Sequence, residues 1–395
     1  MPKETFSAQS PGGDRTGSVG SSRLDRTRCA FLKRLGIGST ITLAALALAV
    51  ASSAQQNIPP QVIVPSANFP TIQSGIDAVP NGGTILIAPG EYRENLLIEG
   101  KQVALVGRDP AHRPRIRAVD PQSNVVTFDA GGGGLMRNLE LEGGDHGIAA
   151  VDPQVTAVVR AENVFIRKSG SGVFGCYASL RFVNGESSHN SRNGFTLLEA
   201  GSLVLDRAEA SHNDCAGILI LNNRSSSEPL VLNRLEVTNN KCGGIEVRGG
   251  ARPVEIRDCF AKLNRVFGIQ LVGVAGAAII NSTISFSKGV AGLFGDGLRV
   301  ERSTSVDLKR SLFSFNARSG ALLIGCSDGR ETSSLLEDNT FLKNEFDIAI
   351  VKLEVCTGTS GVTLSDSGGN VCDGEDCHAV GSDLEAIPTP TLPTT

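Results

Sequence analysis

Tryptophan is absent from this chain of 395 residues, tyrosine occurs only twice, and charged residues make up 20 % of the sequence. The chain therefore has little material for a flat aromatic platform of the kind that holds sugar rings. Glycine, with 46 residues, is more frequent than its usual share of about 7 %. Its frequency still falls far short of the one residue in three that collagen needs. Ala, Glu, Lys and Leu do not dominate, which excludes a coiled coil, and a hydrophobic content of 40 % is too high for a disordered chain.

An uncharged run over residues 35–54 predicts a secretory signal. Ser52 and Ala54 supply the small residues expected just before a cleavage point. The run follows a basic cluster made up of Arg23, Arg26, Arg28, Lys33 and Arg34. An uncleaved membrane anchor is the alternative, but the many Ala, Gly, Ser and Thr residues make the run only moderately apolar and favour cleavage. We therefore expect a secreted or cell-envelope protein, extracellular or periplasmic, that meets a membrane only if this segment stays uncleaved.

The expected organisation is a leader and signal over 1–54, a linker over 55–65, one folded domain over 66–380 and a disordered Pro/Thr tail over 381–395. Removal of residues 1–54 leaves 30 basic and 38 acidic residues, a net charge of −8. This charge argues against a nucleic-acid partner.

Seven segments of the chain align with one another without gaps. Their anchor residues are Asn190, Asn213, Asn240, Asn264, Ser287, Asn316 and Asn344, spaced 23 to 29 residues apart. A large apolar residue stands eight places before every anchor, and Gly recurs four places after five of them, followed by apolar-x-apolar triplets. Each repeat therefore predicts three short strands separated by turns.

A repeat of three short strands without a helix predicts one turn of a parallel β-solenoid, in which each strand pairs with its counterparts about 4.8 Å above and below. The period is too short for a four-stranded propeller blade and lacks the consensus of leucine-rich repeats. Each anchor Asn is expected to take the left-handed conformation at a tight corner and to hydrogen-bond to the Asn of the turns above and below. The recurring Gly is expected to mark another corner.

The entry segment 69–107 carries a resemblance to a known superfamily. Its PTIQSGIDAVP is similar to the N-terminal cap helix, and its PGEYRE to the GxYxE of the first coil, of the right-handed parallel β-helix (pectin-lyase-like) superfamily, which includes the right-handed β-helix repeat proteins. A cap is physically needed because an open solenoid end exposes core and strand edges. The resemblance implies an all-β right-handed parallel β-helix of about 10 to 12 turns with an N-terminal cap helix.

The strand after the recurring Gly presents apolar outward residues at both ends of the solenoid and charged ones midway: Glu246, Arg248, Arg299 and Glu301. Longer turns over 222–229, 325–333 and 353–361 would wall one side of this face. The arrangement predicts a groove with a charged centre as a weak candidate site. The alternative is a set of cross-strand ion pairs on an exposed sheet.

For an enzyme, the resemblance implies a polysaccharide lyase or glycoside hydrolase, with a base beside a cation or with paired Asp near a Gly-His-Gly string. The string Gly144-Asp145-His146-Gly147 has no Asp pair one turn away, and three calcium-binding acids on adjacent turns are not evident. No catalytic role is therefore assigned to any residue. Calcium is the only cofactor that we consider possible, because it would bridge this acidic chain to a polyuronate.

His189 and His212 share one register, so we expect them about 5 Å apart on consecutive turns. Two imidazoles this close resemble a metal site and suggest the periplasmic, metal-related NosD-like group. The other turns carry no ligand in this register, which favours exposed turn histidines and no metal.

Eight cysteines remain after Cys29 leaves with the signal. Cys215 and Cys242 share a register on consecutive turns at a separation that suits a disulfide. Cys372 and Cys377 are predicted to close a short loop, and Cys326 and Cys356 to join two neighbouring loops. Cys259 stands at an expected core position.

Two functional hypotheses follow. The first is an exported β-helix protein that contacts or processes extracellular or cell-envelope polysaccharide. The second is a non-catalytic solenoid that serves as a structural, adhesion or assembly module. The absence of catalytic motifs favours the second hypothesis. The ligands that are usual in the superfamily that the chain resembles favour carbohydrate as a partner.

Overall fold

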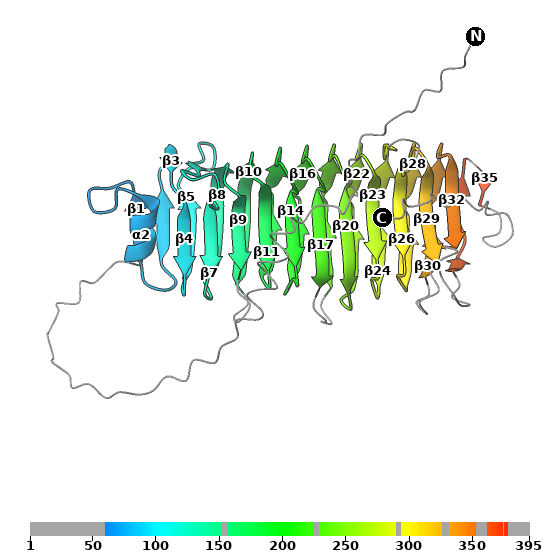
Figure 1. Ribbon diagram of the computed structural model, residues 1–395, viewed down its shortest axis with the longest axis horizontal. Coiled ribbons are helices and arrows are strands. Elements are labelled where there is room, and N and C mark those ends of the chain that lie inside the picture. The colour runs from blue at the N-terminus through cyan, green and yellow to red at the C-terminus, as the bar shows by residue number, and fades with distance from the viewer. Residues whose placement is uncertain are drawn as a thin grey trace, which may run out of the picture.

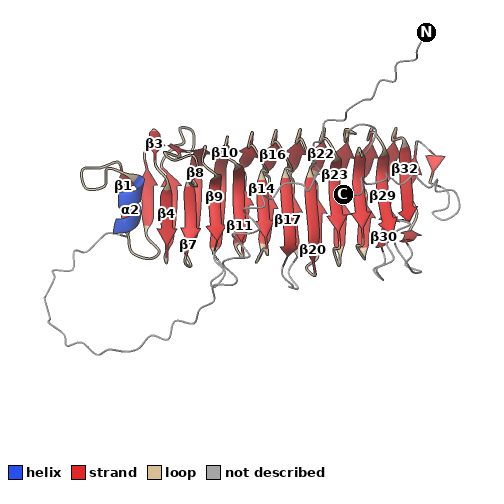
Figure 2. Cartoon of the chain, in the orientation of Figure 1, coloured by secondary structure: helices blue, strands red, loops and turns tan. Residues whose placement is uncertain are grey.

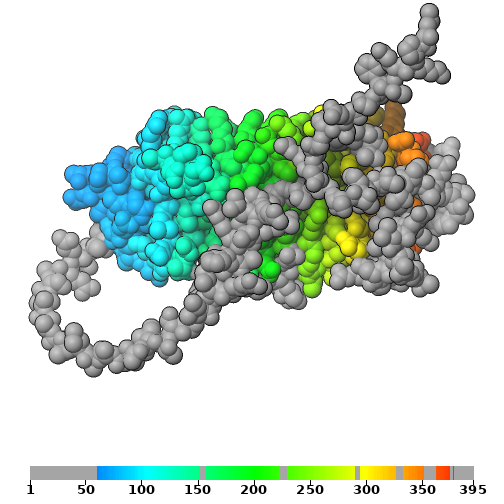
Figure 3. Space-filling model, viewed as in Figure 1, coloured from blue at the N-terminus to red at the C-terminus, as the bar shows by residue number. Residues whose placement is uncertain are grey.

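The computed structural model describes residues 60–151, 157–223, 229–289, 294–325, 332–352, 362–373 and 375–377. The described chain forms an elongated rod of stacked turns, running from the N-terminal turns in blue to the C-terminal turns in orange (Figures 1 and 3). Its one helix, α2 (Ile72–Ala78), lies at the N-terminal end of the rod, as Figure 2 shows. The predicted parallel β-solenoid with an N-terminal cap helix is confirmed.

Each full turn contributes one strand to an eleven-stranded parallel sheet. In spatial order these strands are β4 (Leu96–Glu99), β7 (Val126–Asp129), β9 (His146–Val151), β11 (Ser171–Cys176), β14 (Phe195–Leu198), β17 (Ile218–Asn223), β20 (Ile245–Gly250), β23 (Phe267–Val272), β26 (Asp296–Glu301), β29 (Ser319–Gly325) and β32 (Phe346–Lys352).

The other two strands of each turn belong to a second sheet that bends between two rows. The first row contains β1 (Gln61–Val64), β2 (Thr84–Ile87), β5 (Gln102–Gly107), β12 (Ser179–Val183), β15 (Leu203–Asp206), β18 (Leu230–Asn233), β21 (Val254–Arg257), β24 (Ala277–Ile280), β27 (Val306–Lys309), β30 (Thr332–Glu337) and β33 (Val362–Asp366). The second row contains β3 (Glu91–Arg93), β6 (Arg115–Arg117), β13 (Glu186–Ser188), β16 (Glu209–Ser211), β19 (Glu236–Thr238), β22 (Phe260–Lys262), β25 (Thr283–Ser285), β28 (Leu312–Ser314), β31 (Thr340–Leu342) and β34 (Val371–Cys372). The long strands β8 (Gly133–Glu142) and β10 (Val158–Arg167) run through both rows, and β35 (Glu375–Asp376) pairs antiparallel with β34.

The interior of the rod is a stacked apolar core. In-register pairing places like residues on top of one another, as with Ile218 and Ile245 or Phe313 and Phe341. These side chains are at most 1 % exposed. No helix in the described part of the chain has the length and apolar character needed to cross a membrane.

The turns between the second row and the eleven-stranded sheet carry the anchor residues; we call this line of turns the Asn edge. The predicted ladder is confirmed here: the side-chain amide of Asn190 donates to Asn213 Oδ1 over 2.9 Å, and that of Asn316 to Asn344 Oδ1 over 3.0 Å. Ser287 interrupts it, but the backbone N–H of Ser287 still donates to Asn316 Oδ1. Each buried side-chain amide thus forms its hydrogen bonds with a neighbouring turn and not with water.

One detail of the predicted corners was wrong. The left-handed residue is not the Asn but the one before it, as with His189 at φ 54° and Phe286 at φ 56°. The recurring Gly has no left-handed φ either; a Cβ on Gly217 would lie 2.5 Å from Val237 Cγ1. The chain does bend at Gly194, Gly217 and Gly244, as predicted, and Gly is required there by close packing between turns and not by a left-handed backbone.

Candidate functional site

The four groove candidates lie on two strands of the eleven-stranded sheet. Glu246 and Arg248 are on β20, where the guanidinium hydrogen-bonds to the carboxylate and Glu246 is fully buried. Arg299 and Glu301 are on β26, with 3.6 Å between their charged groups, and β23 separates the two pairs. The structure therefore brings the candidates together as two ion pairs and not as one four-residue cluster.

A buried charge cluster next to β26 was missed from the sequence. Arg318 donates from Nε to Asp296 Oδ1 over 2.8 Å and again to Oδ2, while the Ser319 hydroxyl donates to the same carboxylate. Asp296 is fully buried and Arg318 is 7 % exposed. Burial lowers the pKa of the nearby Arg299 guanidinium, although the carboxylates of Glu301 and Asp296 oppose this.

The chemistry of this cluster is that of a positioned cation. Both oxygens of Asp296 accept hydrogen bonds, so the carboxylate holds Arg318 in place. The sequence signal was the long 29-residue spacing between the anchors Ser287 and Asn316, which inserts residues just before Asp296. Such an insertion shows where a turn departs from the repeat, but not which side chains meet there.

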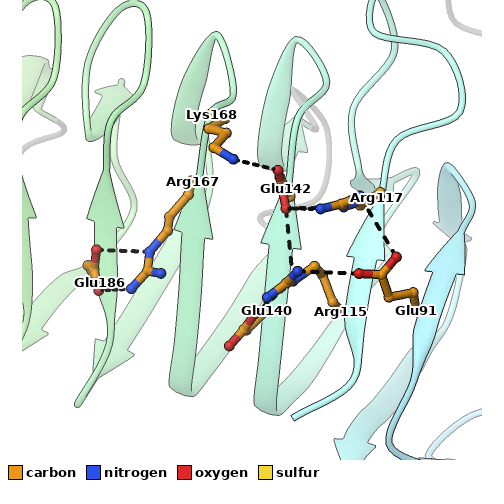
Figure 4. A network of polar contacts seen from close by, with 8 residues as sticks. All are labelled: Glu91, Arg115, Arg117, Glu140, Glu142, Arg167, Lys168 and Glu186. Atoms are coloured by element: carbon orange, nitrogen blue, oxygen red, sulfur yellow. Dashed lines mark hydrogen bonds and ion pairs between the residues drawn. The ribbon is translucent and has the colours of Figure 1, made fainter.

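An ion network covers the second row near the N-terminal end (Figure 4). The sign of the charges alternates from strand to strand: Glu91 on β3, Arg115 and Arg117 on β6, Glu140 and Glu142 on β8, Arg167 on β10 with Lys168 after it, and Glu186 on β13. Each cation lies within ion-pair distance of a neighbouring strand's carboxylate, as in Arg115–Glu140 at 2.9 Å and Arg167–Glu186 at 2.7 Å. Four cations face four anions, so the network stabilises strand register and carries no net charge.

An open polar hollow of about 530 Å³ adjoins this network on the Asn edge. Its lining comes from turns that precede β9, β11 and β14, together with the loop that holds Gln122: Pro121, Gln122, Gly143, Gly144, Asp145, Lys168, Ser169, Gly170, His189, Ser191 and Arg192. A smaller cavity of about 160 Å³ lies beside it, over the ion network, and Lys168 lines both.

Arg192 is held rigidly at the base of the hollow. Its Nη2 donates to Asp145 Oδ1 over 2.7 Å and to the Asp145 carbonyl over 2.8 Å, and lies 3.3 Å from His146 Nδ1. Gly170 makes room for it, because a Cβ there would lie 2.5 Å from Arg192 Nη2. The His146 ring stacks on Phe174 with 4.7 Å between ring centroids, and both side chains are buried.

The charged rim of the hollow is more exposed than its base. The Lys168 side chain is 68 % exposed and pairs with Glu142 at 3.0 Å, whereas the Arg192 side chain is 25 % exposed. One open space is thus lined by a carboxylate, a guanidinium, an ammonium and two hydroxyls. The Asp145-His146 string stands out in the sequence but this space does not, because Arg192 and Lys168 come from different turns.

His189 and His212 stack with 4.9 Å between ring centroids and 6° between ring planes, as their shared register predicts. Within the described ranges, no group of three His, Cys, Asp or Glu side chains is placed to hold a metal ion. The pair has the geometry of stacked turn histidines, and His189 lines the hollow.

The structure contains two of the three predicted disulfides, Cys215–Cys242 and Cys372–Cys377. Cys326 and Cys356 lie outside the described residues. Cys259 is a buried free thiol, as its expected core position implies.

The model of the family described as "Right handed beta helix region" matches residues 124–284 and 230–375 of this chain. Among curated proteins, none matches the sequence.

Similar folds occur among solved structures. The A-module of the Azotobacter vinelandii mannuronan C-5 epimerase AlgE4 is 18 % identical, with a TM-score of 0.59 over 76 % of this chain and 90 % of that one. The periplasmic alginate epimerase AlgG is 12 % identical, with a TM-score of 0.51 over 78 % and 84 %. The catalytic domain of an alpha-1,3-glucanase, solved with tetrasaccharides, is 14 % identical, with a TM-score of 0.52 over 80 % and 70 %. At these identities the likeness shows a shared fold.

Proposed function

The chain belongs to the right-handed β-helix family, and from this premise we propose that it binds a polysaccharide, one sugar of which occupies the hollow lined by Asp145, Lys168 and Arg192. Proteins with the same fold include epimerases of alginate and an alpha-1,3-glucanase, which supports a carbohydrate as the ligand class. Fold alone does not carry this proposal, because one fold supports many functions.

The hollow is the observation that carries it. Its volume of about 530 Å³ lies within the range of small-molecule sites. A sugar ring presents hydroxyls that both donate and accept, and the lining offers both kinds of partner: donors from Lys168 and Arg192, an acceptor from Asp145, and the hydroxyls of Ser169 and Ser191. The rigid guanidinium of Arg192 provides a pre-organised contact, which lowers the entropy cost of binding.

Binding is better supported than catalysis. Asp145 accepts a charge-assisted hydrogen bond from Arg192, and Asp296 accepts from Arg318 and Ser319, so each of these carboxylates is engaged in holding an arginine. A lyase or hydrolase would need a carboxylate or another base aimed at substrate. The proposal is therefore a polysaccharide-binding solenoid.

The disulfides support an exported protein. Cys215–Cys242 and Cys372–Cys377 would persist in an oxidising compartment outside the cytosol. One protein of similar fold is a periplasmic epimerase. The basic leader followed by an uncharged run over 35–54 lies outside the described residues and supplies the route of export in this proposal.

Calorimetric titration with alginate oligosaccharides and with α-1,3-linked glucan oligosaccharides tests the proposal. We expect at least one set to bind the wild-type protein, and Lys168→Gln with Arg192→Gln to weaken that binding at least tenfold. Arg257→Gln is the matched control, since Arg257 pairs with Glu255 on β21 in the first row, outside the lining of the hollow. Equal affinity for all three proteins, or no binding of either probe, would contradict the proposal and favour a structural or assembly solenoid.

The charged pairs on β20 and β26 are the alternative surface, and the same titration separates the two. Glu246→Ala and Arg299→Ala should leave oligosaccharide affinity within twofold of wild type if the hollow is the site. A tenfold loss in these variants, with normal binding by the hollow variants, would place the sugar on the eleven-stranded sheet. Circular dichroism on every variant ensures that folded proteins are compared, because both residues are largely buried.

A further inference from the structure

The Asn edge exposes large apolar side chains in a conformation that they ordinarily avoid. Leu263, Phe286 and Phe315 each precede an anchor and take φ between 55° and 59°. The left-handed region costs such a residue roughly 1–2 kcal/mol, whereas Asn, which fills the same place at Asn239, is tolerated there. These side chains are also 38 to 45 % exposed. Backbone strain and apolar exposure on the same side chains point to a binding role.

These residues form one strip along the rod. The rings of Phe286 and Phe315 are parallel, with 4.9 Å between centroids and 1° between planes. Phe260, 47 % exposed, lies on β22 three residues before Leu263. Of the eight large apolar residues that are exposed in the described part of the chain, these four lie together.

Cations flank the strip. Lys262 lies over the ring of Phe260 with 4.7 Å between Nζ and the ring centroid, and Lys343 lies over Phe315 at 5.4 Å. Arg265 and Lys288 follow the anchors of two consecutive turns and are exposed. We call the whole set the ring strip: Phe260, Lys262, Leu263, Arg265, Phe286, Lys288, Phe315 and Lys343.

The ring strip is locally cationic in an acidic chain. The protein carries a formal net charge of −4, whereas the strip has four cations. The carboxylates beside them are those of Glu345, next to the anchor Asn344, and Asp373, whose Oδ1 accepts the backbone N–H of Lys343 over 2.6 Å. Across the described ranges, Arg265 and Lys288 form no ion pair, in contrast to the fully paired cations of Figure 4. Their charge is therefore available to an anionic ligand.

We propose that the ring strip binds a second segment of the polysaccharide and selects an acidic chain, one that carries carboxylates on its sugars. This inference rests on the proposed function of the hollow. A uronate chain combines apolar C–H surface with carboxylates. The ring edges and Leu263 contact the apolar surface, and Arg265, Lys288, Lys262 and Lys343 pair with the carboxylates.

The two surfaces are continuous along the Asn edge. His189, at the rim of the hollow, occupies the same register as Phe286 and Phe315. Five turns separate His189 from Phe315, which at about 4.8 Å a turn is roughly 24 Å. An extended polysaccharide that lies parallel to the rod axis therefore reaches both, whereas a shorter oligosaccharide reaches only the hollow.

A second copy of this chain is a poorer occupant. A symmetric dimer through the strip would place four cations against the same four cations, which is unfavourable. The strip is also a narrow row of single side chains and not a broad apolar face. An anionic membrane surface matches the charge but does not use the continuity with the hollow.

Substitution to Asn gives a variant suited to the test. Phe286→Asn with Phe315→Asn installs the residue that already stands at Asn239, so the turn conformation is retained and the strain falls. Arg265→Gln with Lys288→Gln removes the free charge. We expect both double variants to unfold at a temperature equal to or above that of wild type, with Arg257→Gln again as the control.

The experiment compares polymeric alginate with an alginate oligosaccharide shorter than about 24 Å, a length set by the turn spacing. We expect both strip variants to bind the polymer at least fivefold more weakly and the oligosaccharide unchanged, and the charge variant to show a weaker salt dependence. Unchanged polymer affinity would overturn the inference. Loss of dimer in light scattering, or loss of binding to phosphatidylglycerol vesicles with alginate binding intact, would assign the strip to another partner.

Failure of the two proposals can be told apart. If the strip variants weaken polymer binding while the Lys168 and Arg192 variants do not, the strip stands and the hollow falls. If only the hollow variants weaken binding, the proposed function stands without the strip. Loss of polymer binding in both, with oligosaccharide binding lost only in the hollow variants, is the result that we expect.

Discussion

The side-chain amide of Asn213 donates to Oδ1 of Asn240, one turn further along the rod, over 3.0 Å. Asn240 in turn donates to Asn264 Oδ1 over 3.0 Å and to the Ala210 carbonyl over 2.9 Å. Each buried amide is thus both donor and acceptor, and removal of one leaves polar groups on two neighbouring turns without partners.

Asn240→Ala should lower the free energy of unfolding by about 1–3 kcal/mol, because buried donors and acceptors lose their hydrogen bonds. Thermal or urea unfolding followed by circular dichroism measures the change. Asn240→Ser is the matched variant, since Ser287 already occupies an anchor position, and it should cost less than Ala. Equal stability of the Ala variant and wild type would show that the ladder contributes nothing.

Gly217→Ala should destabilise the solenoid although its backbone is not left-handed. The added Cβ would lie 2.5 Å from Val237 Cγ1 and 2.8 Å from Asn240 Nδ2, so neighbouring turns must separate. We expect a loss of about 1–3 kcal/mol, as for other overpacked sites. Gly276→Ala is the control, because no atom lies within 4 Å of its added Cβ, and it should be neutral or slightly stabilising. The reverse order of stabilities would refute the packing explanation.

Most of the fold could be predicted from the sequence because it repeats. One alignment of anchor residues specifies strand, turn and register for every turn, and so also the ladder and the contact of Cys215 with Cys242. The position of the left-handed residue could not be assigned, since Asn is common both in that conformation and beside it. Phe286 in this conformation contradicts propensity and was not foreseeable from composition.

The sites were harder to predict because they lie where turns differ. Asp145, Lys168 and Arg192 come from three consecutive turns and line one hollow, in which Gly170 leaves space for the Arg192 guanidinium. Catalytic sequence motifs consist of residues that are close in sequence, so they do not reveal a group whose members come from different turns. Outward orientation on a strand also does not ensure exposure, since the Glu246 side chain is fully buried.

Acid should weaken the protein partly through Glu142. Burial acts to raise the pKa of this carboxyl, but Lys168 at 3.0 Å and Arg117 at 3.1 Å outweigh it and hold the pKa below the usual value. A carboxyl group whose pKa is lower in the folded than in the unfolded protein stabilises the fold. This contribution is complete above the unfolded-state pKa of 4.5 and is lost as the pH falls through the folded-state pKa. Glu142→Gln should therefore show a smaller loss of stability between neutral and acid pH.

The expected difference is at most about 1 kcal/mol, because Lys168 is well exposed and the pair is screened by water. Urea unfolding at a series of pH values measures it. Glu99→Gln is the control, since Glu99 forms no ion pair with any residue in the described ranges. A Glu142→Gln curve parallel to that of wild type would contradict the linkage.

Alkali should weaken the protein through Cys259. Burial raises the pKa of this thiol from 9.0 to about 12, because the side chain is 1 % exposed and the thiolate would lose its hydration. The folded protein therefore keeps the thiol proton in a pH range where the unfolded chain releases it. The free energy of unfolding falls as the pH rises above about 9, by about 1.4 kcal/mol per pH unit.

Cys259→Ser removes the titration while retaining a donor for the Leu232 carbonyl, which lies 3.4 Å from Sγ. The stability difference between wild type and Cys259→Ser should thus shift in favour of the serine variant between pH 9 and pH 11, measured by urea unfolding. A difference independent of pH would mean that the thiol is accessible to water, and alkylation of native protein mapped to the Cys259 peptide would then confirm its exposure.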